Sequence, residues 1–187
     1  MTARPTSLAA VVALSVLTLF AGCSSHKGSG RAADMEFSAV VKAAAPIDPT
    51  LNNTCKGIVW FYEQRDGTVY VVADLEGLNP GQQHAMHVHE KGDCSAPDGA
   101  SAGGHYNPES FPHALPPNEP RHAGDLGNVL ADSSGKAHYE IAVDNISIRG
   151  KNPIESRAVI VHAKVDDGGQ PVGNAGGRIG CGVIAAR

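Results

Sequence analysis

Six histidines and one aspartate recur between residues 87 and 162, in short segments that are otherwise apolar or rich in glycine and proline. They are His87, His89, His105, His113, His122, Asp125 and His162. Neutral imidazole is the commonest metal ligand in proteins, and carboxylate oxygen binds the same borderline-soft ions. Seven such donors exceed the four that one tetrahedral zinc ion takes. The fold is therefore constrained to bring distant segments together around two metal ions.

The donors occur in two kinds of segment. His87 and His89 are two residues apart on a predicted strand, which places both imidazoles on one face. By itself this spacing is weak evidence for a metal site, because a surface strand produces it fairly often. His162 lies in another apolar strand, where a histidine is most often a hydrogen-bonded core residue. The combination of strand histidines, loop histidines and neighbouring cysteines nevertheless favours a built metal site over a disordered histidine-rich tract.

Seven segments alternate or run apolar in the manner of β-strands. They cover residues 36–43, 57–63, 68–75, 84–90, 136–143, 158–163 and 181–185. The chain has 22 Gly and 12 Pro residues, many of them in turn sequences between these segments, and no convincing amphipathic helix. The predicted fold is all-β, an immunoglobulin-like Greek-key antiparallel β-sandwich or barrel.

Two long segments, residues 91–127 and 164–179, interrupt the strand pattern. The first contains six prolines and the second contains repeated glycines. Loops of this length in a compact domain are usually functional or disordered. Because the first carries ligand candidates and the second leads into a cysteine, we predict that metal and a disulfide order these two functional loops.

Four cysteines are present. Cys94 and Cys181 lie in glycine-containing segments close to the proposed metal region, and we predict that they pair. Such a bridge closes a long loop and contributes about 4–5 kcal/mol in the chain-entropy model. Cys55 then stays free or pairs between chains, and Cys23 belongs to the amino-terminal segment.

The amino terminus has the layout of a secretory signal peptide. Arg4 precedes an apolar stretch over residues 8–20, which is too short to span a bilayer as a mature helix. The residues that end at Cys23 resemble the lipobox of bacterial lipoproteins, in which the cysteine is lipidated and becomes the new amino terminus. The alternative is an ordinary secretory peptide with an incidental cysteine.

These features divide the chain into three parts. We predict a lipoprotein-type signal peptide over residues 1–22, a lipidated flexible tether over 23–35 and one domain over 36–187. Such a protein is exported, anchored to a bacterial cell membrane through Cys23, and faces the periplasm or the cell exterior.

Removing residues 1–22 changes the formal net charge from −4 to −5. A mildly acidic domain without a basic stripe is not expected to bind nucleic acid.

Five segments together resemble the copper/zinc superoxide dismutase family. They read AMHVHEKGDC, SAGGHYNPESFPH, RHAGDLGNVLAD, VIVHAKVDD and GNAGGRIGCGVIA. They occur in the family's order within residues 36–185, and HEKGDCSAPD is similar to the bacterial branch. The resemblance implies copper and zinc as cofactors, superoxide anion as the substrate, and dismutation to dioxygen and hydrogen peroxide.

The resemblance also implies how the seven donors divide. The implied copper ligands are His87, His89, His105 and His162. The implied zinc ligands are His105, His113, His122 and Asp125. His105 would bridge the metals and take up a proton during the cycle. Four nitrogens suit Cu(II), whereas three nitrogens and one oxygen suit zinc.

Three further roles are implied by the resemblance. Asp166 would join a copper histidine to a zinc histidine, Arg178 would attract and orient the anion next to copper, and the family pairs the two cysteines that we pair above. The loop before Arg178 is shorter than in eukaryotic members and carries no lysine or glutamate after Lys164. Electrostatic attraction would then depend on Arg178 and on cations such as Lys91 or Lys164.

Other functions remain open for such a chain. One alternative is a non-catalytic copper/zinc-binding or copper-delivery lipoprotein on the same fold, and another is a structural sandwich domain. Loss of a copper ligand or of the arginine would favour the delivery protein, but all of them are present. A homodimer is possible. His26, His84 and His138 are interpreted as solvated or structural.

Overall fold

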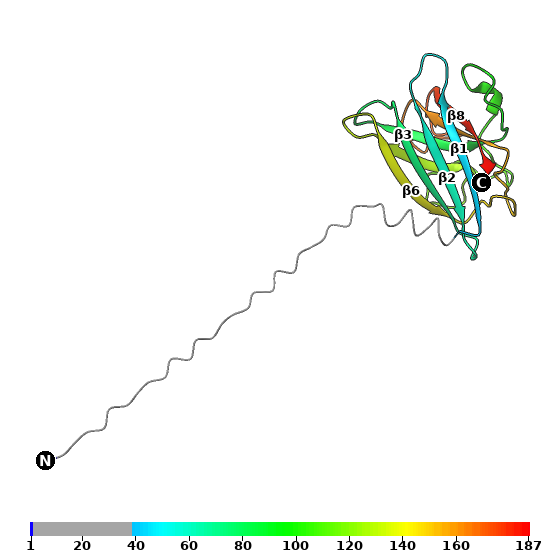
Figure 1. The fold of residues 1–187 in the computed structure, drawn as a ribbon. Helices are drawn as coiled ribbons and strands as arrows, with labels where there is room; N and C mark the ends of the chain where they lie inside the picture. Colours follow the sequence, from blue (N-terminus) through cyan, green and yellow to red (C-terminus); the bar gives the residue numbers. More distant parts are fainter. Residues whose placement is uncertain (2–38) are drawn as a thin grey trace.

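The computed structural model describes Met1 and residues 39–187, so the predicted signal peptide, the tether and residues 36–38 lie outside the described part apart from Met1. Nine β-strands and one short 3-10 turn, Ala100–Ala102, make up the described domain (Figure 1). The strands are β1 (Val41–Pro49), β2 (Lys56–Glu63), β3 (Val69–Glu76), β4 (Gln83–His89), β5 (Asp125–Leu130), β6 (Ala137–Val143), β7 (Ala158–His162), β8 (Arg178–Val183) and β9 (Ala185–Ala186).

The strands form an antiparallel barrel that is nearly closed. Their order is β5-β4-β7-β8-β1-β2-β3-β6, with β9 paired to β1. β1 joins the two halves, because its first part pairs with β2 and its end, Asp48 and Pro49, pairs with β8. The Tyr139 hydroxyl of β6 donates to the Leu126 carbonyl of β5 at 2.7 Å and links the two ends of the order. The predicted all-β Greek-key fold is confirmed.

The core lies inside the barrel and follows from the alternation of side chains along each strand. In β3, Val71, Ala73 and Leu75 are buried while Asp74 is exposed. β7 is different because it is buried along its whole length. One of its faces contributes to the main core, and Ile160 on the other packs beneath the loop that carries Cys94. β7 is therefore a continuous apolar run that ends in His162.

Three strand predictions were displaced or missed. β1 was predicted over 36–43 but runs from Val41 to Pro49, because the inward alternation continues through Ala45 and Ile47 despite Pro46. β5 was assigned in part to the loop over 91–127, because its first residues are buried throughout and show no alternation. β8 begins at Arg178, inside the predicted loop over 164–179, so that loop is shorter than expected.

The cysteines take two different states. Cys94 and Cys181 form a disulfide with a Cα–Cα distance of 5.8 Å. Cys55 is free and fully buried, and burial raises the pKa of its thiol to about 12. A buried and protonated thiol is inert. Within the described residues Cys55 has no disulfide partner.

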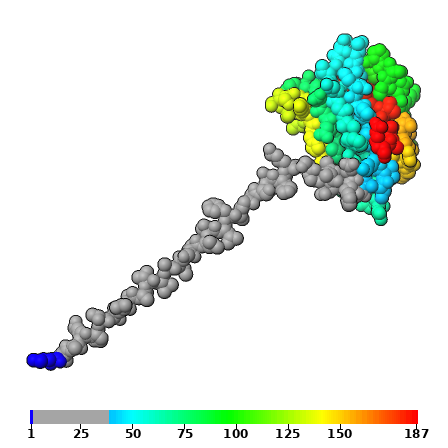
Figure 2. Space-filling view, in the orientation of Figure 1, coloured from blue at the N-terminus to red at the C-terminus, as the bar shows by residue number. Residues whose placement is uncertain are grey.

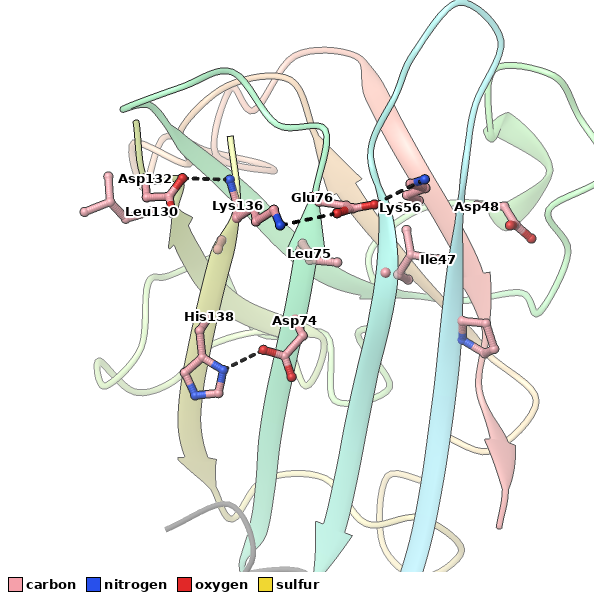
Figure 3. A pocket seen from close by; sticks show the side chains of 13 residues that line it. Ile47, Asp48, Lys56, Asp74, Leu75, Glu76, Leu130, Asp132, Lys136 and His138 are labelled. Carbon is pink, nitrogen blue, oxygen red and sulfur yellow. Dashed lines mark hydrogen bonds and ion pairs between the residues drawn. The ribbon is translucent and has the colours of Figure 1, made fainter. Parts of the chain in front are cut away.

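A cavity is lined by residues of β1, β2, β3, β5 and β6 and of the loop between β5 and β6, and contains charged pairs rather than ligand candidates (Figure 3). Lys56 lies 3.1 Å from Glu76, and His138 Nδ1 lies 2.7 Å from Asp74 Oδ1. The hydrogen bond to Asp74 raises the pKa of His138. His138 therefore has partners on its strand face, although exposed pairs of this kind contribute at most about 1 kcal/mol.

The carboxyl terminus lies beside the first strand, as Figure 2 shows and as the pairing of Ala185 with Ala44 requires. The Arg187 amide also donates to the Lys42 carbonyl at 2.9 Å. Among residues 39–187, no helix has the length and apolar character needed to cross a membrane.

Candidate metal centre

The strands β4 and β7 and the loop after β4 position the first group of histidines. β4 presents His87 and His89 on one face, and β7 ends with His162. The loop returns along β4, where the Tyr106 amide donates to the Val88 carbonyl. The backbone of His105 forms an isolated antiparallel β-bridge with that of His89. Gly124 permits this close approach, because a Cβ at that position would lie 2.2 Å from the Val88 carbonyl oxygen.

One set of four histidines converges at this place and is buried. It consists of His87, His89, His105 and His162, whose candidate ligand nitrogens all lie within 4.8 Å of one another. Three of the rings are fixed through one nitrogen. His87 Nε2 donates to Asp166 Oδ2 at 2.8 Å, His89 Nδ1 to the Gly103 carbonyl at 3.0 Å, and His162 Nδ1 to the Gly176 carbonyl at 3.3 Å.

A second set of four donors converges next to the first. It consists of His105, His113, His122 and Asp125, again with ligand atoms within 4.8 Å of one another. Asp125 Oδ1 lies 3.1 Å from His105 Nδ1, and Asp125 Oδ2 lies 3.0 Å from His113 Nδ1. His122 Nδ1 lies 3.3 Å from His105 Nδ1. Two ring nitrogens at that distance require a shared proton or cation between them.

His105 belongs to both sets, and its two nitrogens serve different neighbours. Its Nδ1 faces Asp125 and His122. Its ring centroid is 4.0 Å from that of His87 and 5.2 Å from that of His89. Since Nδ1 is occupied by the second set, Nε2 is the nitrogen available to the first.

The residues fit metal ions by an independent criterion, which is the presence of buried ring nitrogens without a hydrogen-bond partner. These atoms are His87 Nδ1, His89 Nε2 and His162 Nε2, all in the first set. His113 Nδ1 makes no well-aligned hydrogen bond, but the Asp125 carboxylate lies 3.0 Å from it. An unpaired buried polar atom is costly and needs a structural reason. In each of these rings the opposite nitrogen is held by a carboxylate or a backbone carbonyl, an arrangement typical of metal-ligating histidines. The orphan nitrogens are those that a metal would take.

The charge state of the rings also suits metal binding. Burial lowers the pKa of His89 to about 2 and that of His162 to about 3, and the positive charge of Arg178 acts in the same direction. Such rings are neutral, which is the form that ligates metal. Burial opposes protonation of His113 too, but two neighbouring carboxylates raise the pKa of His113 to about 9. Those carboxylates supply negative charge for a cation.

Asp166 lies behind both sets and contacts one ring of each. Its Oδ2 accepts from His87 Nε2 at 2.8 Å and its Oδ1 from His113 Nε2 at 2.9 Å. Burial opposes its ionisation, but these hydrogen bonds hold its pKa well below the ordinary range. The adjacent Asp167 is exposed and caps its own turn by accepting from the Gly169 amide.

Arg178 lies at the start of β8, and its guanidinium is tied to the loop closed by the disulfide. It donates from Nη1 to the Gly99 carbonyl and from Nη2 to the Gly103 carbonyl, both at 2.6 Å. The Gly103 carbonyl also accepts from His89 Nδ1. The guanidinium is therefore positioned next to the first set by the same backbone that orients one of its rings.

Sequence reasoning missed two residues that position the site. Asn128 forms two hydrogen bonds with the backbone of Asp166, at 2.8 and 3.0 Å. His84 is fully buried, and its Nδ1 donates to the His162 carbonyl at 2.8 Å. The position of His84, three residues before the His87-Val88-His89 motif, was the one available signal, and it was interpreted as structural.

An antiparallel barrel with seven buried, converging donors defines a metalloprotein with two adjacent metal sites. The model of the family described as copper/zinc superoxide dismutase (SODC) matches residues 55–184. The chain belongs to that family.

Individual relatives agree with the family match. The chain is 46% identical over 142 residues to a superoxide dismutase [Cu-Zn] of Paramecium bursaria Chlorella virus 1, covering 72% of this chain and 74% of the relative. It is 39% identical over 145 residues to an extracellular superoxide dismutase [Cu-Zn] of Brugia pahangi, covering 72% and 71%. A crystal structure of the clock protein EA4 superposes with a TM-score of 0.71 at 39% identity, covering 77% of this chain and 93% of that one.

These findings confirm the function, class of enzyme and cofactors expected from the sequence. The protein is a superoxide dismutase, an oxidoreductase that converts superoxide to dioxygen and hydrogen peroxide, and it uses copper and zinc.

Proposed function

We propose that the two sets of converging donors are the copper and zinc sites of this enzyme. Copper is assigned to His87, His89, His105 and His162. Zinc is assigned to His105, His113, His122 and Asp125. The observation that carries the assignment is the convergence of two buried donor sets that share His105. The copper set has unpartnered ring nitrogens, and in the zinc set the Asp125 carboxylate contacts both His105 and His113. Four nitrogens suit copper, and three nitrogens with one carboxylate oxygen suit zinc.

Copper, when bound, supplies the one-electron redox couple, and zinc supplies a fixed charge without redox chemistry. The protein residues attract and orient the superoxide anion and protonate the product. Arg178 offers fixed donors to a small anion next to the copper set. In the state in which it does not ligate copper, His105 Nε2, the nitrogen directed away from Asp125, would take up a proton from solvent and pass it to the product. Lys91 and Lys164 are exposed cations that we propose as additional attraction for superoxide.

The assignment predicts metal-selective losses. Replacing His162 by alanine removes one donor of the copper set alone, and replacing His122 by alanine removes one donor of the zinc set alone. We expect His162→Ala to lose copper and retain zinc, and His122→Ala to do the reverse, when metal content is measured after dialysis. His138→Ala, which removes an exposed histidine with no part in either set, should keep both metals. Equal losses of the two metals in each variant would contradict the division.

We further propose that residues 1–22 are a lipoprotein signal peptide, that residues 23–35 form a lipidated tether, that residues 36–187 are the catalytic domain, and that lipidated Cys23 anchors the exported enzyme to a bacterial membrane. The support is the apolar stretch before Cys23, together with the extracellular location named for the Brugia relative. On this proposal the enzyme removes superoxide at the cell envelope.

The anchor has a direct test. In a bacterial host, processing of the full chain should be blocked by globomycin, an inhibitor of lipoprotein signal peptidase, and Cys23→Ala should release the domain from the membrane fraction. Cys55→Ser, which changes a cysteine inside the folded domain, is the matched control and should remain membrane-bound. Globomycin-insensitive processing of the unmodified chain would favour an ordinary secretory peptide.

A copper-delivery protein on the same fold is the competing function. Delivery would be favoured by a metal-replete chain that fails to dismutate superoxide. The complete donor sets and the placement of Arg178 beside the copper set favour catalysis.

A further inference from the structure

The backbone around His113 belongs to no strand, yet the residue is only 2% exposed. The ring is held by two carboxylates, with Nδ1 3.0 Å from Asp125 and Nε2 2.9 Å from Asp166. Buried backbone groups also need partners, and a loop residue without sheet neighbours must find them elsewhere. For His113 those partners come from one side chain that is distant in the sequence.

Gln170 supplies both partners. Its Nε2 donates to the His113 carbonyl at 2.6 Å, and its Oε1 accepts from the His113 amide at 3.2 Å. A side-chain amide paired in this way reproduces the two hydrogen bonds of a strand neighbour. The two residues are 57 positions apart, so the contact joins the zinc-ligand loop to the loop before Arg178.

The loop that carries Gln170 has a defined shape, which allows it to act as a support. The Asp167 carboxylate accepts from the Gly169 amide at 2.8 Å and from Asn174 Nδ2 at 3.2 Å. The Gly173 amide donates to the Gly169 carbonyl at 2.6 Å, and the Asp167 amide to the Gly173 carbonyl at 3.0 Å. Gln170 therefore projects from a turn that is held by its own hydrogen bonds. Although Gln170 is exposed, its side chain reaches His113.

We propose that Gln170 is a positioning residue for zinc. By fixing both backbone groups of His113, its amide sets the direction of the imidazole between Asp125 and Asp166 and slows the release of zinc. The inference rests on the proposed assignment of His113 to zinc. Groups that orient metal ligands affect metal affinity by about 10–100-fold when they are replaced.

The test compares zinc release from the full metal-loaded protein and two variants. Gln170→Ala removes both hydrogen bonds, and Gln170→Glu keeps an acceptor for the His113 amide but places an oxygen against the His113 carbonyl. We expect both to transfer zinc to a chromogenic chelator at least about 10-fold faster than the unmodified protein. Gln82→Ala, which makes the same change on an exposed turn away from the site, should leave the rate unchanged.

A second readout separates positioning from general stability. With Co²⁺ in place of zinc, the visible absorption bands report the ligand geometry, and they should shift in Gln170→Ala but not in Gln82→Ala. Gln170→Ala also leaves the His113 amide and carbonyl unpaired, so the Tm of the metal-free variant is measured as well, and the cobalt bands distinguish an altered ligand geometry from that loss of stability. Unchanged zinc release, or unchanged cobalt bands, in Gln170→Ala would overturn the proposal. An unmodified protein that holds no zinc overturns the metal assignment as well, whereas a zinc-replete protein with equal release rates overturns only the role of Gln170.

Discussion

Replacing His105 by alanine is expected to abolish superoxide dismutation and to deplete both metals. Among residues 39–187, His105 is the one donor that the two converging sets share. Its loss takes a nitrogen from each set at once. Because removal of an orienting group already costs about 10–100-fold, removal of a shared ligand should lower activity by more than about 100-fold. Copper and zinc content, measured with the dismutation rate, checks the prediction.

The single-set variants provide the comparison for His105→Ala. His162→Ala and His122→Ala should each deplete one metal, so depletion of both distinguishes the shared ligand from its neighbours. His138→Ala should have no effect on metals or rate. A His105→Ala protein that keeps both metals and full activity would show that the two sets do not meet at this residue.

Loss of the disulfide is expected to lower the free energy of unfolding by about 4–5 kcal/mol in the chain-entropy model. The bond joins residues 87 positions apart and holds the loop after β4 against β8. The same loop carries the Gly99 and Gly103 carbonyls that receive the Arg178 guanidinium. We therefore expect the variant with both Cys94→Ser and Cys181→Ser to lose activity as well as stability.

Denaturant unfolding of the metal-free protein measures the stability loss without the contribution of metal binding. The unmodified protein in a strong thiol reductant should unfold at the same denaturant concentration as the double variant. Cys55→Ala, which truncates a buried free thiol, serves as a control that should retain the disulfide. Equal unfolding free energies for the double variant and the unmodified protein would contradict the prediction.

The strand pattern and the candidate ligands could be predicted because each leaves a local signature. Alternation in β3 and β6 marks one buried face. The two-residue spacing of His87 and His89 places both rings on one side of β4. The division into a copper and a zinc set came from resemblance to the family, because spacing alone does not show which loop histidine meets which strand.

The parts that could not be predicted depend on long-range contacts of side-chain amides and on strands without alternation. β5 is buried at most positions and so shows no period of two. Asn128 and Gln170 each bond to the backbone of a residue far along the chain, 38 and 57 positions away. An amide that replaces a strand neighbour leaves no motif, because the residue it bonds to is distant in the sequence.

Asp166 has a thermodynamic consequence for how the enzyme is loaded. One carboxylate accepts a hydrogen bond from a ring of each set, so binding at one set and binding at the other share Asp166. If zinc raises the affinity for copper by some factor, copper must raise the affinity for zinc by the same factor. At limiting metal, half-loaded molecules would then be less populated than two independent sites would give.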